Sequence, residues 1–212
     1  MTYDVIIIGA GPGGIFSAYE LTERCPDKRI AVFEAGHALN RRRCPIDGEK
    51  IKTCIGCKSC SIMSGFGGAG AFSDGKYNIT NDFGGTLYEY IGKQQALDLM
   101  HYVDEINMLY GGEGTKLYST ANTKIKRTCL ENGLHLLDAQ VRHLGPDINY
   151  VVLENLYAEL KEKGDFYFNT AVTGVSRTDE GYDIHTAAGS YSCRKCVVSV
   201  GRSGSKWMET VC

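Results

Sequence analysis

The apolar positions at the start of the chain predict a strand, a helix and a second strand in close succession. Val5–Ile8 is an unbroken apolar run rich in β-branched residues, which is typical of a parallel strand buried on both faces. Ile15, Ala18 and Leu21 then recur at helical spacing. Residues 30–34 (IAVFE) alternate as a second strand and end on an acid. The pattern therefore predicts a β-α-β unit within the first 35 residues.

Downstream of this unit, the pattern predicts helices first and then further strands. Residues 86–110 and 120–132 carry apolar residues at helical spacing. Residues 148–163 predict another helix, which Asp147 caps and Gly164 ends. Strands are expected at 134–144, 165–169, 171–177, 181–186 and 196–200.

The order of these elements predicts an α/β protein built on a parallel sheet. We expect a discontinuous nucleotide-binding domain that takes residues 1–40 and 145–212. Residues 41–144 would then form an insertion of helices and loops, which includes a cysteine-rich stretch and a glycine-rich loop.

The turn between the first strand and the first helix has the spacing G-x-G-x-x-G. Gly9 permits a tight turn, Gly11 lets a pyrophosphate approach the backbone, and Gly14 lets the helix pack closely on the sheet. The helix that follows directs free N–H groups and the positive end of its dipole at the phosphates. We therefore expect a dinucleotide to bind at Gly9, Gly11, Pro12, Gly13 and Gly14.

The second strand ends on Glu34, which lies 20 residues after Gly14. This placement lets the carboxylate accept hydrogen bonds from the two ribose hydroxyls of an adenosine. The acid serves FAD and NAD equally, so it predicts a dinucleotide without choosing between the two. The alternative is an ordinary strand–helix–strand unit with incidental glycines.

Composition narrows the class of protein. The 212 residues contain 23 Lys and Arg against 25 Asp and Glu, which gives a net charge of −2. This charge argues against nucleic acid as the main partner and therefore against a tRNA-modifying enzyme. With 43% apolar and 23% charged residues, the chain can form a packed core. It has no apolar run of the ~18–20 residues that span a bilayer, and we identify no signal peptide. We therefore expect a cytoplasmic protein.

Glycine is abundant, with 26 residues, and five of them fall within the twelve residues from Gly65 to Lys76. This segment is too rich in glycine for a stable helix or strand, and its backbone N–H groups can approach a flat or anionic group. A flexible surface loop is the alternative, which the embedded Phe66 and Phe72 argue against. The basic run 41–43 is either a solvated cluster or a source of positive charge for a cofactor.

Cysteine is also abundant, with nine residues. Cys54, Cys57 and Cys60 form a C-x-x-C-x-x-C run, and Cys44 precedes a proline ten residues upstream. Thiolates three residues apart in a turn can converge on one soft metal, so these four cysteines predict an iron–sulfur cluster or a zinc site. Redox-active thiols, or no shared task, are the alternatives.

The second C-x-x-C begins at Cys193 and ends at Cys196, where the strand expected at 196–200 begins. If that strand extends back through Cys193, the two residues point to opposite faces and cannot chelate one ion. We interpret the following as ordinary buried or incidental thiols: Cys25, Cys129, Cys193, Cys196 and Cys212.

Four segments carry a resemblance to a known family: residues 42–46 (RRCPI), 64–76 (SGFGGAGAFSDGK), 142–145 (RHLG) and 199–204 (SVGRSG). The chain resembles the bacterial FAD-dependent dehydrogenases, which are NAD(P)/FAD-dependent oxidoreductases of the glutathione-reductase-like class. The resemblance implies a Rossmann-like FAD-binding domain. It also implies a substrate domain beyond Gly204, so we expect this chain to be a truncated portion that holds FAD weakly by itself.

The resemblance also assigns contacts to the cofactor. Ala35 follows the ribose acid, and Arg42 or Arg43 would neutralise charge near the adenosine or the pyrophosphate. The loop that passes the isoalloxazine and the pyrophosphate would include Gly67, Gly68 and Ala69. The backbone of Val172 would meet the adenine, and Gly201 would lie on the diphosphate side. His143 is either a residue beside the flavin or substrate, or a structural histidine at the end of a strand.

Together these features predict a FAD-dependent oxidoreductase whose flavin carries out hydride or electron transfer. NAD(P)H is a candidate electron donor, and a cysteine-ligated centre would relay single electrons to a partner. The competing class is a non-catalytic FAD-binding or electron-transfer module, or an inactive portion of a larger flavoenzyme. The substrate, the electron acceptor and the catalytic residues cannot be read from the sequence.

Overall fold

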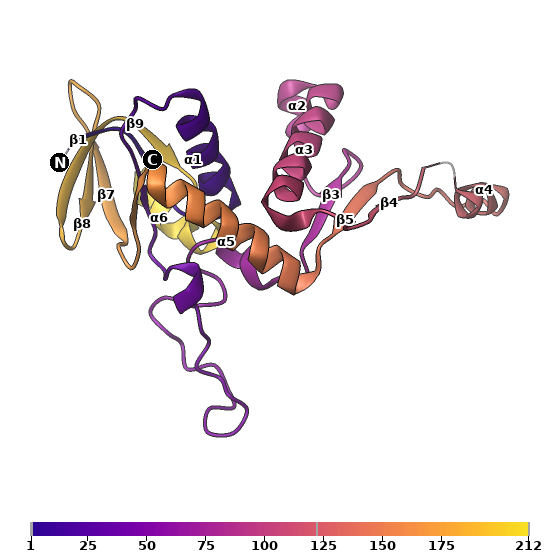
Figure 1. Ribbon diagram of the computed structural model, residues 1–212, viewed down its shortest axis with the longest axis horizontal. Coiled ribbons are helices and arrows are strands. Elements are labelled where there is room, and N and C mark those ends of the chain that lie inside the picture. The colour runs from indigo at the N-terminus through magenta and orange to yellow at the C-terminus, as the bar shows by residue number, and fades with distance from the viewer. Residues whose placement is uncertain (1, 122, 212) are drawn as a thin grey trace. The chain divides into compact units, whose positions relative to one another are not determined.

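The computed structural model describes residues 2–121 and 123–211, so Cys212 lies outside the described residues (Figure 1). Two compact units are present, one formed by Met1–Ala71 with Leu156–Cys212 and the other by Phe72–Asn155. The division of the chain into domains 1–40 with 145–212 and 41–144 stays a prediction.

The first unit contains a six-stranded sheet in the order β6-β2-β1-β9-β8-β7. The strand β1 (Thr2–Ile8) pairs in parallel with β2 (Ile30–Phe33) and with β9 (Gly189–Val198), and β2 pairs in parallel with β6 (Asp165–Tyr167). Helix α1 (Pro12–Arg24) connects β1 to β2 and contacts both strands. The predicted α/β fold with its β-α-β start is therefore confirmed.

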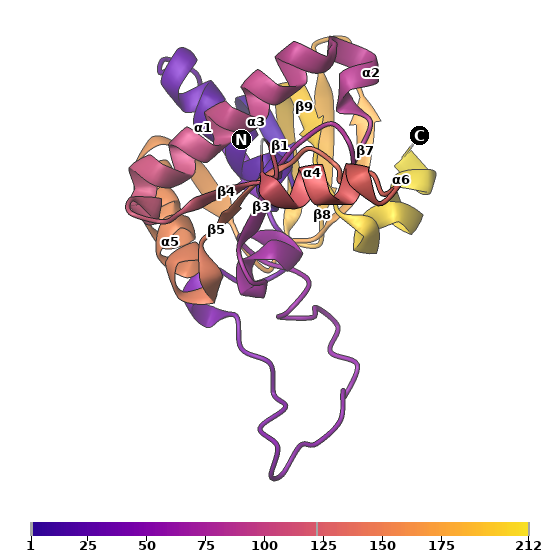
Figure 2. The same cartoon turned by 90° about the vertical axis from the view of Figure 1, so that its right-hand side faces the viewer.

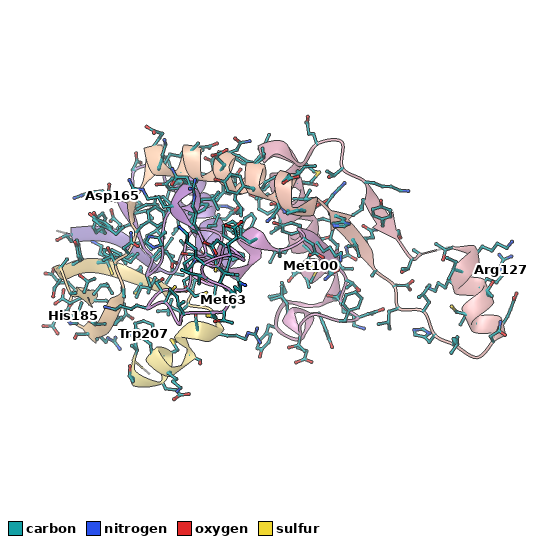
Figure 3. The ribbon with its side chains drawn as sticks, turned by 90° about the horizontal axis from the view of Figure 1, so that it is seen from below. Met63, Met100, Arg127, Asp165, His185 and Trp207 are labelled. Carbon is teal, nitrogen blue, oxygen red and sulfur yellow. The ribbon has the colours of Figure 1, made fainter. Side chains whose placement is uncertain are left out.

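The centre of this sheet is buried because β1 and β2 are apolar on both faces. Ile6 and Ile7 are fully buried, and every residue of β2 is buried. Phe33 stacks on Tyr167 of β6 with ring centroids 4.6 Å apart. Trp207 of α6 (Ser205–Val211), labelled in Figure 3, packs against the same core.

The other half of the sheet is an antiparallel meander, so the sheet is mainly but not wholly parallel. β7 (Val172–Arg177), β8 (Tyr182–Thr186) and β9 pair in antiparallel register, and Figure 2 shows them side by side. Their connections are too short to carry the crossover that parallel strands need. The strand predicted at 196–200 is longer than expected and begins at Gly189.

The second unit contains most of the helices of the predicted insertion. The predicted helix 86–110 is divided into α2 (Leu87–Ile91) and α3 (Lys93–Asn107), because the backbone at Gly92 has a φ of +86°. A π-helical turn (Met108–Gly112) follows α3. Helix α4 (Lys124–Glu131) is shorter than the predicted 120–132 and is capped by Thr123, whose hydroxyl accepts the Lys126 N–H.

A small antiparallel sheet in this unit was not predicted. It joins β3 (Lys76–Ile79), β5 (Gln140–His143) and β4 (Leu117–Ser119) in the order β3-β5-β4. Arg142 of β5 donates to the Asp104 carboxylate of α3 from Nε at 3.0 Å and from Nη2 at 2.7 Å, with both side chains largely buried. This pair anchors α3 to the small sheet and raises the pKa of Arg142.

Helix α5 (Gly145–Lys163) begins in the second unit and ends in the first. Its last turns present Leu156 and Leu160 to the core of the first unit, and both side chains are almost fully buried. Across residues 2–121 and 123–211, no helix combines the length and apolar character needed to cross a membrane.

Candidate functional site

The glycine turn between β1 and α1 has the geometry that its spacing predicts. Gly9 has a φ of +103°, and a Cβ there would lie 2.5 Å from the carbonyl oxygen of Ser199. A Cβ on Gly14 would lie 1.9 Å from the carbonyl oxygen of Gly9. Both positions therefore require glycine, the first for the turn and the second for the close approach of helix and strand.

The N-terminus of α1 is suited to an anion. Gly11 is the N-cap residue and Pro12 opens the first turn, and among the described residues no side chain caps this end by hydrogen bonding. The first turn of α1 contains no acidic residue. The backbone N–H groups at this end, together with the positive end of the helix dipole, are therefore available to a phosphate.

Glu34 at the end of β2 has a structural role that the sequence did not reveal. Its side chain is 7% exposed, and Oε2 accepts the Ala10 N–H at 2.8 Å. Its other oxygen, Oε1, accepts the N–H groups of Gly36 at 2.8 Å and Gly65 at 2.9 Å. The carboxylate thus joins the glycine turn, the segment after β2 and the glycine-rich loop, while its predicted contact with a ribose stays a prediction.

The glycine-rich loop lies directly against the glycine turn. The Gly67 N–H donates to the Ala10 carbonyl at 2.8 Å, and a Cβ on Gly68 would lie 3.1 Å from the Cα of Gly11. Phe66 anchors the loop, because its ring is fully buried and packs 4.9 Å from that of Tyr157. Two segments that were predicted separately to bind a cofactor therefore form one glycine-lined surface. Ala69, in the 3-10 helix η2 (Gly68–Phe72), is exposed.

The two candidate arginines differ in their surroundings. Arg42 is 4% exposed, and its guanidinium donates to three carbonyl oxygens, those of Ser61 at 2.9 Å, Ile62 at 2.8 Å and Phe66 at 2.7 Å. Burial lowers the pKa of Arg42, and nearby Glu34 opposes this shift. Arg42 therefore clamps the chain on both sides of Ser64, whereas Arg43 is exposed.

After β9 the chain returns to the glycine turn and places Ser199 there, a residue that was not predicted to belong to the site. The Ser199 N–H donates to the Ile8 carbonyl at 2.8 Å, and a Cβ on Gly13 would lie 2.5 Å from Ser199 Oγ. Gly201 is exposed, and no described atom lies within 4 Å of where its Cβ would be. Val172, the first residue of β7, is half-buried against the sheet core.

The cysteines fall into two groups by exposure. Cys44, Cys54, Cys57 and Cys60 are all exposed and free. Among residues 2–121 and 123–211, no three or more His, Cys, Asp or Glu side chains are gathered as a metal site requires. The predicted iron–sulfur or zinc centre therefore has no assembled ligand set in this structure.

The prediction that Cys193 and Cys196 point to opposite faces of a strand is wrong. Their thiols share a hydrogen bond, and both residues belong to the same core of the sheet. This bond lowers the pKa of Cys193 and raises that of Cys196. Cys25 and Cys129 are half-buried.

His143 lies at the end of β5 opposite Lys76, and its side chain is exposed.

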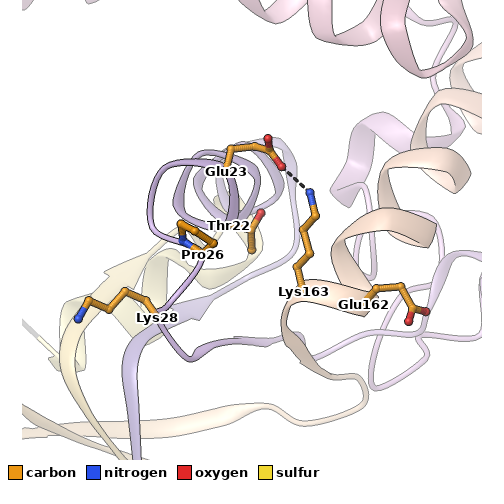
Figure 4. Close-up of a pocket in the computed structure, with 6 residues that line it drawn as sticks. All are labelled: Thr22, Glu23, Pro26, Lys28, Glu162 and Lys163. Carbon is orange, nitrogen blue, oxygen red and sulfur yellow. Dashed lines mark hydrogen bonds and ion pairs between the residues drawn. The ribbon is translucent and has the colours of Figure 1, made fainter.

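A hollow of about 450 Å³ lies at the C-terminal end of α1, where Figure 4 shows Glu23 paired with Lys163. Lys163 also donates to Glu159 at 2.6 Å, and these two carboxylates raise its pKa to about 12. The walls of this hollow contain none of the predicted site residues.

No family model and no curated protein matches the sequence. Solved structures do match: a glycine oxidase from Geobacillus kaustophilus has a TM-score of 0.55 at 19% identity over 98% of this chain. NikD, described as an unusual amino acid oxidase essential for nikkomycin biosynthesis, has a TM-score of 0.53 at 13% identity over 99% of this chain. A glycine oxidase from Bacillus cereus has a TM-score of 0.52 at 14% identity over 98% of this chain.

The chain has the fold of a Rossmann-like FAD-binding domain. It spans 58% of the length of each glycine oxidase and 54% of that of NikD. At these identities the likeness concerns the fold.

Proposed function

We propose that this chain binds FAD and forms the cofactor-binding part of a FAD-dependent oxidoreductase. The observation that carries the proposal is the glycine-lined surface formed by Gly9–Gly14 and the loop at Gly67 and Gly68. Glycines line this surface, so no side chain keeps a pyrophosphate away from the backbone N–H groups. The uncapped N-terminus of α1 supplies the matching positive dipole.

We assign the individual contacts as follows. The pyrophosphate would lie over Gly11, Pro12 and Gly13 at the start of α1. The carboxylate of Glu34 has four lone pairs, of which three already accept backbone N–H groups, so one is free for a ribose hydroxyl. Ala35, Arg43, Ala69, the backbone of Val172 and Gly201 would complete the cofactor contacts. Arg42 would act indirectly by holding the loop.

When bound, FAD supplies the hydride and electron chemistry, and the protein orients it. The neighbours in structure are named as oxidases of glycine and other amino acids, so a small amine or amino acid is the first substrate class to test. NAD(P)H is the second, as an electron donor. The free cysteines among the described residues fit a reducing compartment such as the cytoplasm.

The test of FAD binding is a titration of the purified chain monitored by flavin fluorescence, with Gly11→Val as the variant. The backbone of Gly11 has a φ of −75°, and its Cβ would meet only the Cα of Gly68, at 3.9 Å. A side chain there should leave the fold intact while it blocks the pyrophosphate. We expect FAD binding at least about 10-fold weaker, or about 1.4 kcal/mol, at an unchanged midpoint of thermal unfolding.

Gly85→Ala is the matched control, because Gly85 lies in the second unit with open space around its Cβ position. Wild-type protein that fails to bind FAD at about 1 mM would overturn the proposal. Equal affinity of wild type and Gly11→Val would overturn the assigned pyrophosphate position. Anaerobic bleaching of bound flavin by amino acids, or by NAD(P)H, would distinguish an enzyme from a non-catalytic module.

A further inference from the structure

The segment between Arg42 and Ser64 has an unusual distribution of cysteine. Of the eight cysteines within the described residues, four are exposed, and these four all lie in this segment. Free cysteine is among the most buried residue types in proteins, so a group of exposed thiols calls for an explanation. The four exposed cysteines are also those that have the spacing of metal ligands.

This segment contains little of its own to stabilise it. The described residues 43–60 form no helix or strand, and Figure 2 shows the loop running away from the sheet of its own unit. Most of its residues are exposed, including Ile46 at 41% and Ile55 at 60%. Long loops without secondary structure are uncommon in compact domains and are usually either functional or disordered. A bound metal is one way to order such a segment, because its binding energy becomes folding energy.

The ends of the loop are nevertheless held together. Arg42 donates from Nε to the Ser61 carbonyl at 2.9 Å and from Nη2 to the Ile62 carbonyl at 2.8 Å. Cys60 is the residue before Ser61, and Cys44 follows Arg42 by two positions, which is at most about 7 Å of chain. The Arg42 clamp therefore ties the two ends of the loop, which carry Cys44 and Cys60, to one side chain.

The other two thiols are joined to this pair by short stretches of chain. Cys54 and Cys57 are separated by Ile55 and Gly56, and Gly56 has a φ of +65° with open space around its Cβ position. Residues 54–57 form no turn in this structure, and a glycine between the two cysteines permits the tight turn that would bring them onto one ion. Cys57 then lies only three residues from Cys60, whose carbonyl accepts the N–H groups of Met63 at 3.0 Å and Ser64 at 2.8 Å.

We propose that Cys44, Cys54, Cys57 and Cys60 together bind a soft metal centre, an iron–sulfur cluster or Zn²⁺. The thiols are not yet gathered in the structure, so the loop closes on the metal as it binds. Each cysteine loses its proton to solvent and binds as a thiolate. None of these four cysteines is among the residues assigned to FAD, so the two sites have separate ligands.

The experiment is metal analysis of the full 212-residue chain purified without oxygen, with absorption spectra before and after reconstitution. One sample receives Zn²⁺ alone, and another receives iron and sulfide. The test variant is Cys57→Ser, and the control is Cys129→Ser, which changes a half-buried thiol on α4. We expect about one zinc, or up to about four irons with acid-labile sulfide, per wild-type and Cys129→Ser chain.

Cys57→Ser should lose most of the bound metal and retain the thermal unfolding midpoint of metal-free wild type. Alkylation of the thiols provides a second measurement, because metal should protect four cysteines in wild type and in Cys129→Ser. Retention of metal by Cys57→Ser would refute this ligand set. Metal-free wild type after both reconstitutions, with all four exposed thiols rapidly alkylated, would refute the site itself.

Discussion

Replacement of Glu34 by glutamine tests whether this residue holds the site together before any cofactor binds. The substitution preserves shape and removes the negative charge. Glutamine has one carbonyl oxygen, whereas the structure uses both carboxylate oxygens of Glu34 as acceptors. If the amide oxygen takes the place of Oε1, it keeps the N–H groups of Gly36 and Gly65, and the amide NH₂ then faces the N–H of Ala10.

The expected loss of stability follows from these three contacts. Leaving the buried Ala10 N–H without an acceptor costs about 1–3 kcal/mol. The other two bonds change from charged to neutral, which costs about 0.5–1 kcal/mol each. The sum is a decrease of about 2–5 kcal/mol in the free energy of unfolding, a large fraction of the ~5–15 kcal/mol that a typical domain has. Loss of the negative charge beside buried Arg42 adds to the decrease.

The assay is urea unfolding of the cofactor-free chain, with the midpoint and slope compared between variants. Glu20→Gln is the matched control: Glu20 pairs with Arg24 on the surface of α1, so its replacement should change stability by at most about 0.5 kcal/mol. Because no FAD is present, a decrease seen only in Glu34→Gln reports the backbone contacts. If the two variants unfold at the same urea concentration, the structural role assigned to Glu34 is wrong.

Three further predictions concern the same unit. Gly14→Ala places a Cβ 1.9 Å from the Gly9 carbonyl oxygen, so the free energy of unfolding measured in urea should fall by more than about 2 kcal/mol. A decrease below about 0.5 kcal/mol would contradict the close packing of α1 on β1. In Arg42→Lys a single nitrogen replaces the three guanidinium nitrogens that each reach a different carbonyl, so limited proteolysis should cut the 43–60 loop faster than in Arg43→Lys. Equal rates would argue against the clamp. Burial and hydrogen bonds to Tyr167 and Asp165 raise the pKa of Tyr3 above its ordinary 10.0, so its contribution is fully present below about pH 10 and is lost as pH rises. Stability should therefore fall above about pH 10 by up to about 1.4 kcal/mol per pH unit more steeply in wild type than in Tyr3→Phe, and parallel curves would exclude this contribution.

Local patterns predicted the parts of this fold that depend on neighbours in sequence. The strand at Val5–Ile8, helix α1 and the turn glycines follow from burial and from backbone conformation over a few residues. The predicted helix 86–110 shows where such patterns stop being sufficient. Its apolar spacing continues through Gly92, but the backbone there has a φ of +86° and the helix is divided. Helical periodicity reports which face is buried, and it does not report a change in direction of the chain.

Pairing between distant segments was beyond the reach of the sequence pattern. Strand β3 and strand β5 have four residues each, and Lys76 pairs with His143 across 66 intervening residues. The four residues of β3 have too few alternating positions to stand out from a loop, whereas β5 lies within the strand predicted at 134–144 but is shorter, at Gln140–His143. Cys193 and Cys196 illustrate the same limit, because ideal strand geometry assigns them to opposite faces whereas their thiols hydrogen-bond.

The sequence by itself determined the β-α-β unit, the glycine turn and the acid at the end of β2, because local sterics and burial require these residue types at these spacings. The tertiary structure alone decided how they are assembled. It placed the glycine-rich loop against Gly11, used Glu34 as an acceptor for three segments, and made Arg42 a clamp for the cysteine loop. The physical reason is that a buried charge must find hydrogen-bond partners, and which backbone groups are available depends on the folded chain rather than on sequence neighbours.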